Sequence, residues 1–92
     1  MLDTHRSALE SVAHVVFPTR VAAEKHGTLT NHAGRVQAVR PAVEPAWEAL
    51  AEGEVITRLG HALGLPNWPA RWDARSVARE LAAAHPALAE PA

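Results

Sequence analysis

The residues best suited to chemistry lie together between Glu24 and Gln37, in the stretch EKHGTLTNHAGRVQ. Glu24, Lys25 and His26 place a carboxylate, an ammonium and an imidazole side by side, and such groups can transfer protons. No serine, cysteine or second carboxylate stands close in sequence to complete a catalytic set. The favoured interpretation is therefore a solvated turn with an ion pair, and no catalytic residue is predicted.

The same stretch is the best candidate for a metal or phosphate site, but its residues favour neither. His26 and His32 flank the expected turn, but no carboxylate or cysteine completes a recognisable ligand spacing, so no metal site is predicted. The segment GTLTN lacks the glycine-rich pattern, followed by lysine and serine or threonine, of a phosphate-binding loop.

A β-hairpin is the element expected to position these residues. From Thr28 to Val39 apolar and polar side chains alternate, which is typical of half-buried strands. Asn31 and Gly34 lie between the two arms, and both residue types suit the left-handed conformations of hairpin loops. The sequence therefore predicts two strands joined by a turn around residues 31–34.

Two shorter elements are expected before the hairpin. Asp3 or Thr4 can cap a short helix that ends near Val12. The run HVVF at residues 14–17 predicts a buried apolar strand that Pro18 ends, placed at the edge of a sheet whose other strands lie outside this chain.

After the hairpin the pattern becomes helical. Pro45 fits the first turn of a helix that runs to about Leu63, where Gly64 would stop it. Its predicted apolar face comprises Trp47, Leu50, Ala51, Val55, Leu59, Ala62 and Leu63.

A second helix is predicted from Asp73 as cap to about Ala84, with Val77 and Leu81 facing inward. The linker LPNWPARW between the two helices carries Trp68 and Trp72. These rings could pack between the helices or form a docking surface, and their spacing does not decide between the two.

The expected fold class is α+β, mainly α-helical with one short strand and a β-hairpin. Residues 1–44 would form the helix, strand and hairpin segment, and residues 45–92 the two helices, as one structural unit. A chain of 92 residues that is rich in alanine and has a single Phe buries little apolar area, so we expect weak stability in isolation.

Composition excludes several classes of function. There is no cysteine, so this chain can supply no thiol nucleophile, disulfide or cysteine ligand to an iron–sulfur cluster. A net charge of −1 argues against a nucleic-acid partner. No apolar run approaches the ~20 residues that span a bilayer, and the N-terminus does not resemble a secretory signal, so a cytoplasmic location without membrane insertion is expected.

Charge is nevertheless unevenly distributed. Residues 20–40 carry four basic side chains and one acidic one, whereas residues 41–65 carry one basic and four acidic. These two regions could pair with each other, or the basic region could face an anion or an acidic partner.

The order of several sequence blocks resembles the molybdopterin oxidoreductase family over about residues 8–65. The blocks are HVVFP, AEKHGTLTN, GRVQAVRPAVEP and a helix that ends RLGHALGL. Typical members read ADVVLP, EKDGTFTN and EGRVQ, followed by a proline-rich step into a helix. The resemblance implies that the chain is an incomplete piece of a larger α/β fold.

Residue by residue, the family's strand block matches Val15, Val16 and Pro18, within a signature spanning residues 15–45. Its hairpin block matches Glu24, Gly27, Thr28, Asn31, Gly34, Arg35 and Gln37. The resemblance implies that this block lies near the pterin-dinucleotide pocket, with Arg35 as the expected cofactor contact. Two positions differ from the family pattern: His14 replaces an Asp, and Ala33 replaces a Glu.

Three functions follow from the resemblance. The favoured one is a C-terminal structural segment of a chain like the large, iron–sulfur-bearing subunit of NADH-quinone oxidoreductase. The resemblance implies that molybdopterin enzymes of the family continue after this helix into a large dinucleotide-binding domain, which this sequence does not contain. Such a segment would bind no cofactor and have no activity alone. Its partners would be the rest of the large subunit or neighbouring respiratory subunits, peripheral to the inner face of the cell membrane. The parent family uses iron–sulfur clusters and, in some members, molybdopterin guanine dinucleotide.

The first alternative is a fragment of a molybdopterin-dependent oxidoreductase such as a formate dehydrogenase, in which Arg35 would help to hold the cofactor. The second alternative is an independent helical protein-interaction module.

Overall fold

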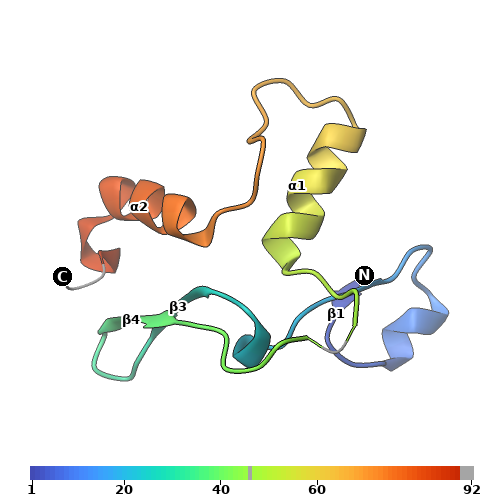
Figure 1. Cartoon of the computed structure of the whole chain (residues 1–92), viewed down its shortest axis with the longest axis horizontal. Coiled ribbons are helices and arrows are strands. Elements are labelled where there is room, and N and C mark those ends of the chain that lie inside the picture. Colours follow the sequence, from blue (N-terminus) through green and yellow to red (C-terminus); the bar gives the residue numbers. More distant parts are fainter. Residues whose placement is uncertain (46, 90–92) are drawn as a thin grey trace. The chain divides into compact units, whose positions relative to one another are not determined.

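A computed structural model describes residues 1–45 and 47–89 of the chain (Figure 1). The described elements comprise four short strands and two α-helices, which confirms the α+β class. The strands and helices are β1 (Leu2–Asp3), β2 (Phe17–Pro18), β3 (Gly27–Thr30), β4 (Val36–Val39), α1 (Glu52–Ala62) and α2 (Ala74–Ala84). Three 3₁₀ turns accompany them, at Ala8–Ser11, Ala22–Glu24 and Pro86–Leu88.

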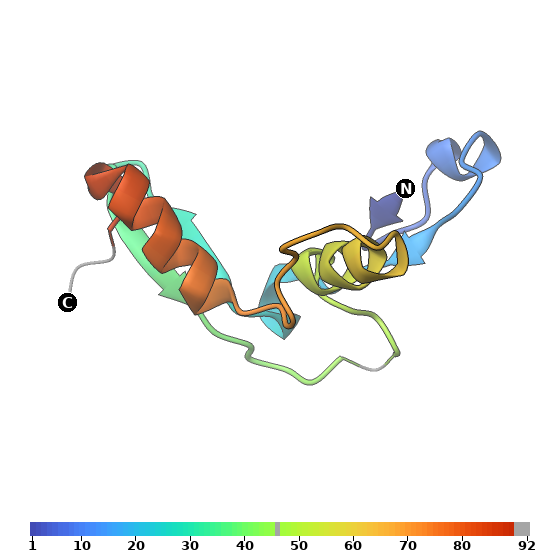
Figure 2. The same cartoon turned by 90° about the horizontal axis from the view of Figure 1, so that it is seen from above.

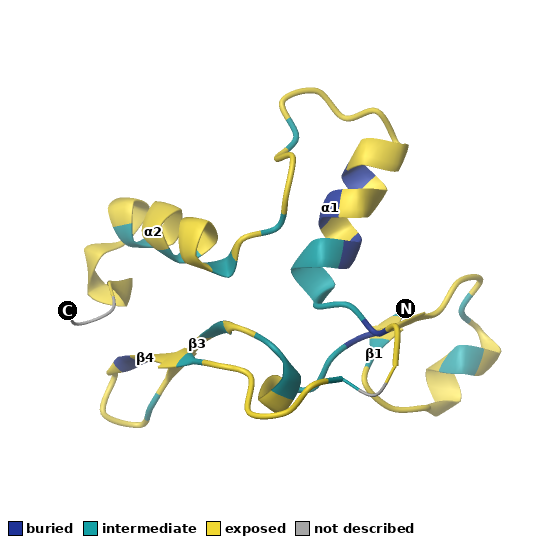
Figure 3. Cartoon of the chain, in the orientation of Figure 1, coloured by how far each residue is buried: buried dark blue, intermediate teal, exposed yellow. Residues whose placement is uncertain are grey.

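The chain divides into two compact units, each of which draws on both halves of the sequence. Unit 1 comprises residues 1–21 and 44–72, and unit 2 comprises residues 22–43 and 73–92. Burial is sparse in both: the buried hydrophobic residues of the described chain are Val36, Ala49 and Val55 (Figure 3). Neither α1 nor α2, the α-helices of the described residues, has the length and apolar character needed to cross a membrane.

Unit 1 is built on a parallel pair of strands, β1 and β2, with Leu2 opposite Phe17. The backbone N–H of Phe17 donates to the Met1 carbonyl at 2.8 Å, and that of Thr19 donates to the Asp3 carbonyl at 2.9 Å. On its other side the same segment bridges to Leu50, where the Arg20 N–H donates to the Leu50 carbonyl at 3.2 Å. Residues 17–20 therefore pair on both edges.

This pairing corrects both predictions made for the N-terminal segment. The helix expected up to Val12 is absent apart from the 3₁₀ turn at Ala8–Ser11, because Leu2 and Asp3 are extended against β2. The strand expected at residues 14–17 is displaced to Phe17–Pro18, and its partner lies within the chain. Val15, Val16 and Phe17 are exposed rather than buried.

Helix α1 begins seven residues later than the predicted start at Pro45. Ala49 and Leu50 are held extended beside residues 19–20, where Arg20 Nε donates to the Ala49 carbonyl at 2.8 Å. Trp47 therefore lies before the helix and is 81% exposed, so its predicted place on the apolar face is wrong. Leu59 and Leu63 are also exposed, whereas Val55 is buried as predicted.

The predicted helix stop at Gly64 is confirmed. Gly64 has a φ of 66°, in the left-handed region that glycine tolerates. Its N–H donates to the His61 carbonyl at 3.0 Å, and the Leu65 N–H donates to the Gly60 carbonyl at 3.1 Å. This pair of bonds is the Schellman arrangement that ends many helices.

Beyond this stop the linker runs back along α1 (Figure 2). Its two tryptophans lie over two glycines of that helix. A Cβ added to Gly60 would overlap the ring of Trp68, and one added to Gly53 would overlap that of Trp72. The indole N–H of Trp68 donates to the Thr57 carbonyl at 2.9 Å. Both rings therefore pack within unit 1, and the question that the sequence left open is answered in favour of packing.

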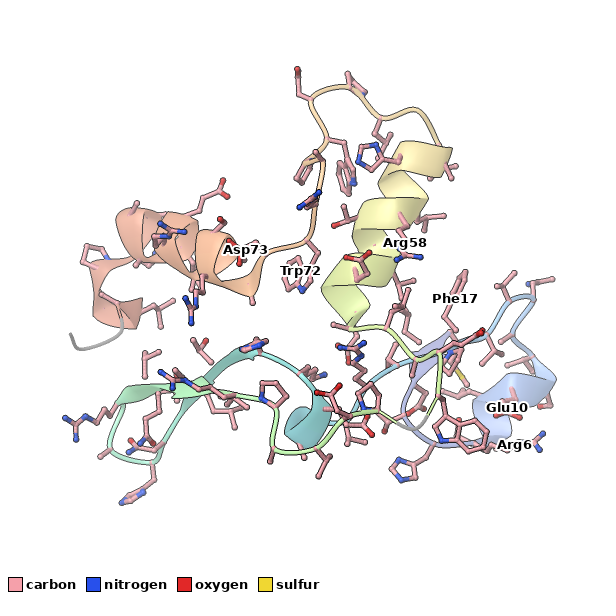
Figure 4. The ribbon with its side chains drawn as sticks, in the orientation of Figure 1. Arg6, Glu10, Phe17, Arg58, Trp72 and Asp73 are labelled. Atoms are coloured by element: carbon pink, nitrogen blue, oxygen red, sulfur yellow. The ribbon has the colours of Figure 1, made fainter. Side chains whose placement is uncertain are left out.

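Unit 2 combines the β3–β4 hairpin with α2, which lies against β3. Asp73 caps α2 as predicted: its carboxylate accepts from the backbone N–H groups of Arg75 and Ser76 at 3.2 Å each, and from Ser76 Oγ at 2.6 Å (Figure 4). The half-buried stripe of α2 consists of Ala74, Ala78 and Ala82. Val77 and Leu81 are each 45% exposed, so their predicted inward orientation is wrong.

Gly60→Ala should destabilise unit 1, although alanine favours a helix over glycine by about 0.5–1 kcal/mol. The added methyl group would displace Trp68 and break its bond to the Thr57 carbonyl. Overpacking of this kind costs about 1–3 kcal/mol, so we expect a net loss of about 1–2 kcal/mol. Urea unfolding followed by tryptophan emission measures it. Gly27→Ala is the control, because nothing lies within 4 Å of its added Cβ. Unchanged or increased stability of Gly60→Ala would contradict the packing.

The cap of α2 should be sensitive to acid. Two hydrogen bonds lower the pKa of Asp73: the one from Ser76 Oγ has the larger effect, and the one from the Arg75 N–H adds to it. A depressed folded-state pKa means that the cap stabilises the helix above the unfolded pKa of about 3.9, and that this contribution is lost as pH falls through the lower folded value. Helical circular dichroism should therefore decline in acid for the wild type. Asp73→Asn, which caps without titrating, should remove this part of the decline; an identical acid profile for both proteins would refute the assignment.

Candidate functional site

The hairpin that carries the family signature forms with the predicted topology. β3 and β4 are antiparallel, with Gly27 opposite Val39, Leu29 opposite Gln37 and Thr30 opposite Val36. Val36 is 6% exposed and anchors the hairpin in unit 2. The loop between the strands spans residues 31–35, as the turn residues predict.

Asn31 organises this loop with its side chain and its backbone. Its Oδ1 accepts from the backbone N–H of Ala33 at 3.0 Å and from that of Arg35 at 2.9 Å. Its own N–H donates to the Arg35 carbonyl at 3.0 Å, and its carbonyl accepts from the Gly34 N–H at 2.9 Å. Gly34 has a φ of 77°, so the predicted left-handed conformation is confirmed there, whereas Asn31 does not have a positive φ.

Arg35 is thereby fixed through its backbone while its side chain projects from the loop. Both its N–H and its carbonyl are bonded to Asn31, and the residue is exposed. Among residues 1–45 and 47–89 its guanidinium has no ion-pair partner. A positioned cation of this kind can bind an anionic group but performs no bond-breaking step alone.

The other signature residues are spread along the hairpin and its approach. Glu24 ends the 3₁₀ turn at Ala22–Glu24 and is half-buried, Gly27 and Thr28 begin β3, and Gln37 is exposed on β4. The structure brings together only the loop residues Asn31, Gly34 and Arg35. Within the described part of the chain, no three histidine or acidic residues gather as metal ligands would.

A second feature of unit 2 was not predicted from the sequence. A groove of about 590 Å³ lies between α2 and the hairpin, with Arg75 and Arg79 on one wall and His26 and Arg40 on the other. Its helical floor includes Ala74, Ala78 and Ala82. The three arginines are up to 39 positions apart in the sequence, so only the fold reveals their proximity. The recurrence of alanine at every fourth position of α2 was the sequence signal that could have indicated the floor of this groove.

Comparison with known proteins identifies the family. Residues 1–62 match the model of the molybdopterin oxidoreductase family, so the chain belongs to that family. The match contains β1 to α1 and the whole hairpin but does not include α2. No solved structure matches significantly.

Curated relatives are alpha subunits of two kinds of oxidoreductase. The NADPH-Fe(3+) oxidoreductase subunit alpha of Geobacter sulfurreducens is 50% identical over 48 residues, which are 52% of this chain and 6% of that protein. The F420-dependent formate dehydrogenase subunit alpha of Methanocaldococcus jannaschii is 47% identical over 62 residues, 67% of this chain and 9% of that protein. A second formate dehydrogenase alpha subunit, from Methanococcus maripaludis, is 36% identical over the same length.

These relatives confirm the family predicted from the sequence. They are alpha subunits of an NADPH-Fe(3+) oxidoreductase and of two formate dehydrogenases, and none of the three is the large subunit of an NADH-quinone oxidoreductase. The chain spans less than a tenth of each of these relatives.

Asn31→Ala should open the hairpin loop, because the N–H groups of Ala33 and Arg35 lose their shared acceptor. Each lost bond contributes about 0.5–1.5 kcal/mol. Amide hydrogen exchange at Ala33 and Arg35 should accelerate several-fold. Gly34→Val should disturb the loop further, because a β-branched residue tolerates positive φ poorly. His32→Ala serves as the control in the same loop, and equal exchange in all variants would contradict the role of Asn31.

Proposed function

We propose that this chain is a structural segment of the alpha subunit of a molybdopterin-dependent oxidoreductase of the formate dehydrogenase type. In this role it performs no chemistry alone. It supplies the hairpin that presents Arg35 toward the cofactor region of the assembled subunit. Residues that transfer electrons or protons would come from the remainder of that subunit and its partners.

The observation that carries this proposal is the exposed apolar surface of the β1–β2 pair. Val15, Val16, Phe17 and Leu2 are all at least 40% exposed. Parallel strands occur almost only in sheets covered on both faces, and a two-stranded parallel pair has too little cover to be stable alone. The pair therefore has the character of a sheet portion that further strands and helices would complete.

The relatives support the same conclusion independently. Sequence identity near 50% is confined to stretches of 48 and 62 residues within much longer alpha subunits. The family match over residues 1–62 includes the hairpin that the resemblance placed near the pterin dinucleotide. Formate dehydrogenase is preferred over the NADPH-Fe(3+) enzyme as the type because its match extends over more of this chain.

The residues present fit one contact to an anionic cofactor. The pterin dinucleotide carries phosphoryl groups, and a guanidinium binds such oxygens in a bidentate manner. Arg35 offers a guanidinium that its neighbours leave available and a backbone that Asn31 holds in place. When bound, the cofactor would supply the redox chemistry, and the loop would contribute binding and orientation.

The large subunit of NADH-quinone oxidoreductase is a second candidate type for the same segment. The exposed β1–β2 surface of this chain would fit that type equally well, but that type requires no cofactor near Arg35. Loss of the Arg35 guanidinium should therefore lower cofactor retention in the formate dehydrogenase type and have no such effect in the NADH-quinone oxidoreductase type. An independent interaction module, by contrast, needs no further subunit sequence.

Sequencing the genomic DNA on both sides of the coding region tests whether a parent subunit exists. An in-frame extension or an adjacent gene that encodes the remaining sheet and cysteine clusters would support the proposal. Unrelated neighbours on both sides would sink it and favour the independent module.

In the assembled subunit, Arg35→Gln should lower pterin retention at least about tenfold, because a charge-assisted hydrogen bond contributes about 1.5–3 kcal/mol. Pterin fluorescence after acid release and molybdenum content per protein measure this retention without relying on activity. Arg58→Gln on α1 is the matched control. Full retention in Arg35→Gln, with pterin present in the wild type, would refute the cofactor contact; a wild-type subunit without pterin would favour the NADH-quinone oxidoreductase type.

A further inference from the structure

We propose that the groove between α2 and the β3–β4 hairpin is a docking site for an acidic segment of a partner protein. This site goes beyond the proposed function, because α2 lies outside the residues that match the family. Its charged residues come from both walls, and their charge, exposure and spacing favour an acidic partner.

The groove is strongly basic for its size. Arg40, Arg75 and Arg79 all line it, and among the residues that the structure describes no carboxylate lines it. Within the described chain Arg40 and Arg75 have no ion-pair partner. Arg79 Nε donates to the Arg75 carbonyl at 3.4 Å, and its ion-pair partner within the described chain is the Asp73 carboxylate at 4.0 Å. That carboxylate already accepts three hydrogen bonds at the cap of α2. The described residues therefore leave the positive charge in the groove largely uncompensated.

The exposure of these groups favours a polypeptide over a small phosphorylated ligand. A small-molecule site encloses most of its ligand. Here the Arg79 side chain is 79% exposed, and Arg40 and Arg75 are exposed as well. Exposed guanidiniums along an open groove attract and orient an acidic partner surface, since complementary charge raises association rates and fixes register.

The floor of the groove suits close approach of a second chain. Ala74, Ala78 and Ala82 recur every four residues, so they lie on one face of α2. The hairpin side of the groove includes the small residues Gly27 and Ala38, together with Thr28 and Val39. A partner segment with small apolar residues toward this floor and carboxylates toward the arginines would match both features.

The test uses the full chain and a fluorescein-labelled synthetic peptide of alternating glutamate and alanine. We expect fluorescence anisotropy to show binding that weakens with salt, because exposed charges are screened. The double substitution Arg75→Gln and Arg79→Gln should weaken binding about five- to tenfold, as expected for the loss of two partly exposed charge pairs. Arg40→Gln, on the opposite wall, should weaken it as well.

The matched control is the double substitution Arg58→Gln and Arg71→Gln, which removes the same charge from residues that do not line the groove. Equal weakening by the two double variants would show non-specific attraction and overturn the proposal. Absence of peptide binding to the wild type would also overturn it. Inorganic pyrophosphate is added as a competitor: if pyrophosphate binds through Arg75 and Arg79 while the peptide does not, the groove is a small-anion site instead. Circular dichroism verifies that α2 persists in each variant.

Discussion

Unit 1 depends on the backbone pairing of residues 17–20. One edge of this segment bonds to Met1 and Asp3, and the other bonds to Leu50. Thr19, at its centre, is 5% exposed and is among the most buried residues described. Because Leu50 is held extended by this pairing, α1 can begin only after Ala51, and Trp47 is left in a connection rather than on a helix. A single long-range constraint thus sets the position of the first strands and of the helix.

The sequence predicted the elements whose signals are local. Asn31 and Gly34 predicted the hairpin loop, Asp73 predicted the start of α2, and Gly64 predicted the end of α1. Each of these residues acts on backbone groups within a few positions of itself, so its type and spacing carry the information. The pairing of Leu2 with Phe17 has no such local signal. An isolated Asp near the N-terminus is compatible with either a helix cap or a turn, and only the partner strand decides between them.

The helix faces were mispredicted for a different physical reason. Periodicity assigns the buried side to the largest apolar residues, yet in this chain small residues make the closest contacts. Trp68 and Trp72 approach α1 over glycines, and the half-buried face of α2 consists of alanines. A face built from glycine or alanine allows a ring or a strand to come near the helix backbone, which partly compensates for the small apolar area of each residue. Val77 and Leu81 are consequently turned toward solvent within unit 2, where hydrophobicity alone would have placed them inside.

The candidate site shows why the sequence could single out Arg35 for a proposed role without defining a functional centre. Asn31 uses its side-chain oxygen to hold the Arg35 backbone, and this leaves the Arg35 guanidinium available for an external anion. The loop therefore has the order of a binding element, whereas the acids, bases and ligands of a reaction are not gathered around it within the described residues. The same separation appears at β1–β2, where backbone hydrogen bonds are made but apolar side chains remain exposed. In both places the backbone hydrogen bonds are formed while side chains remain exposed. This pattern is expected when a segment fits into a larger subunit.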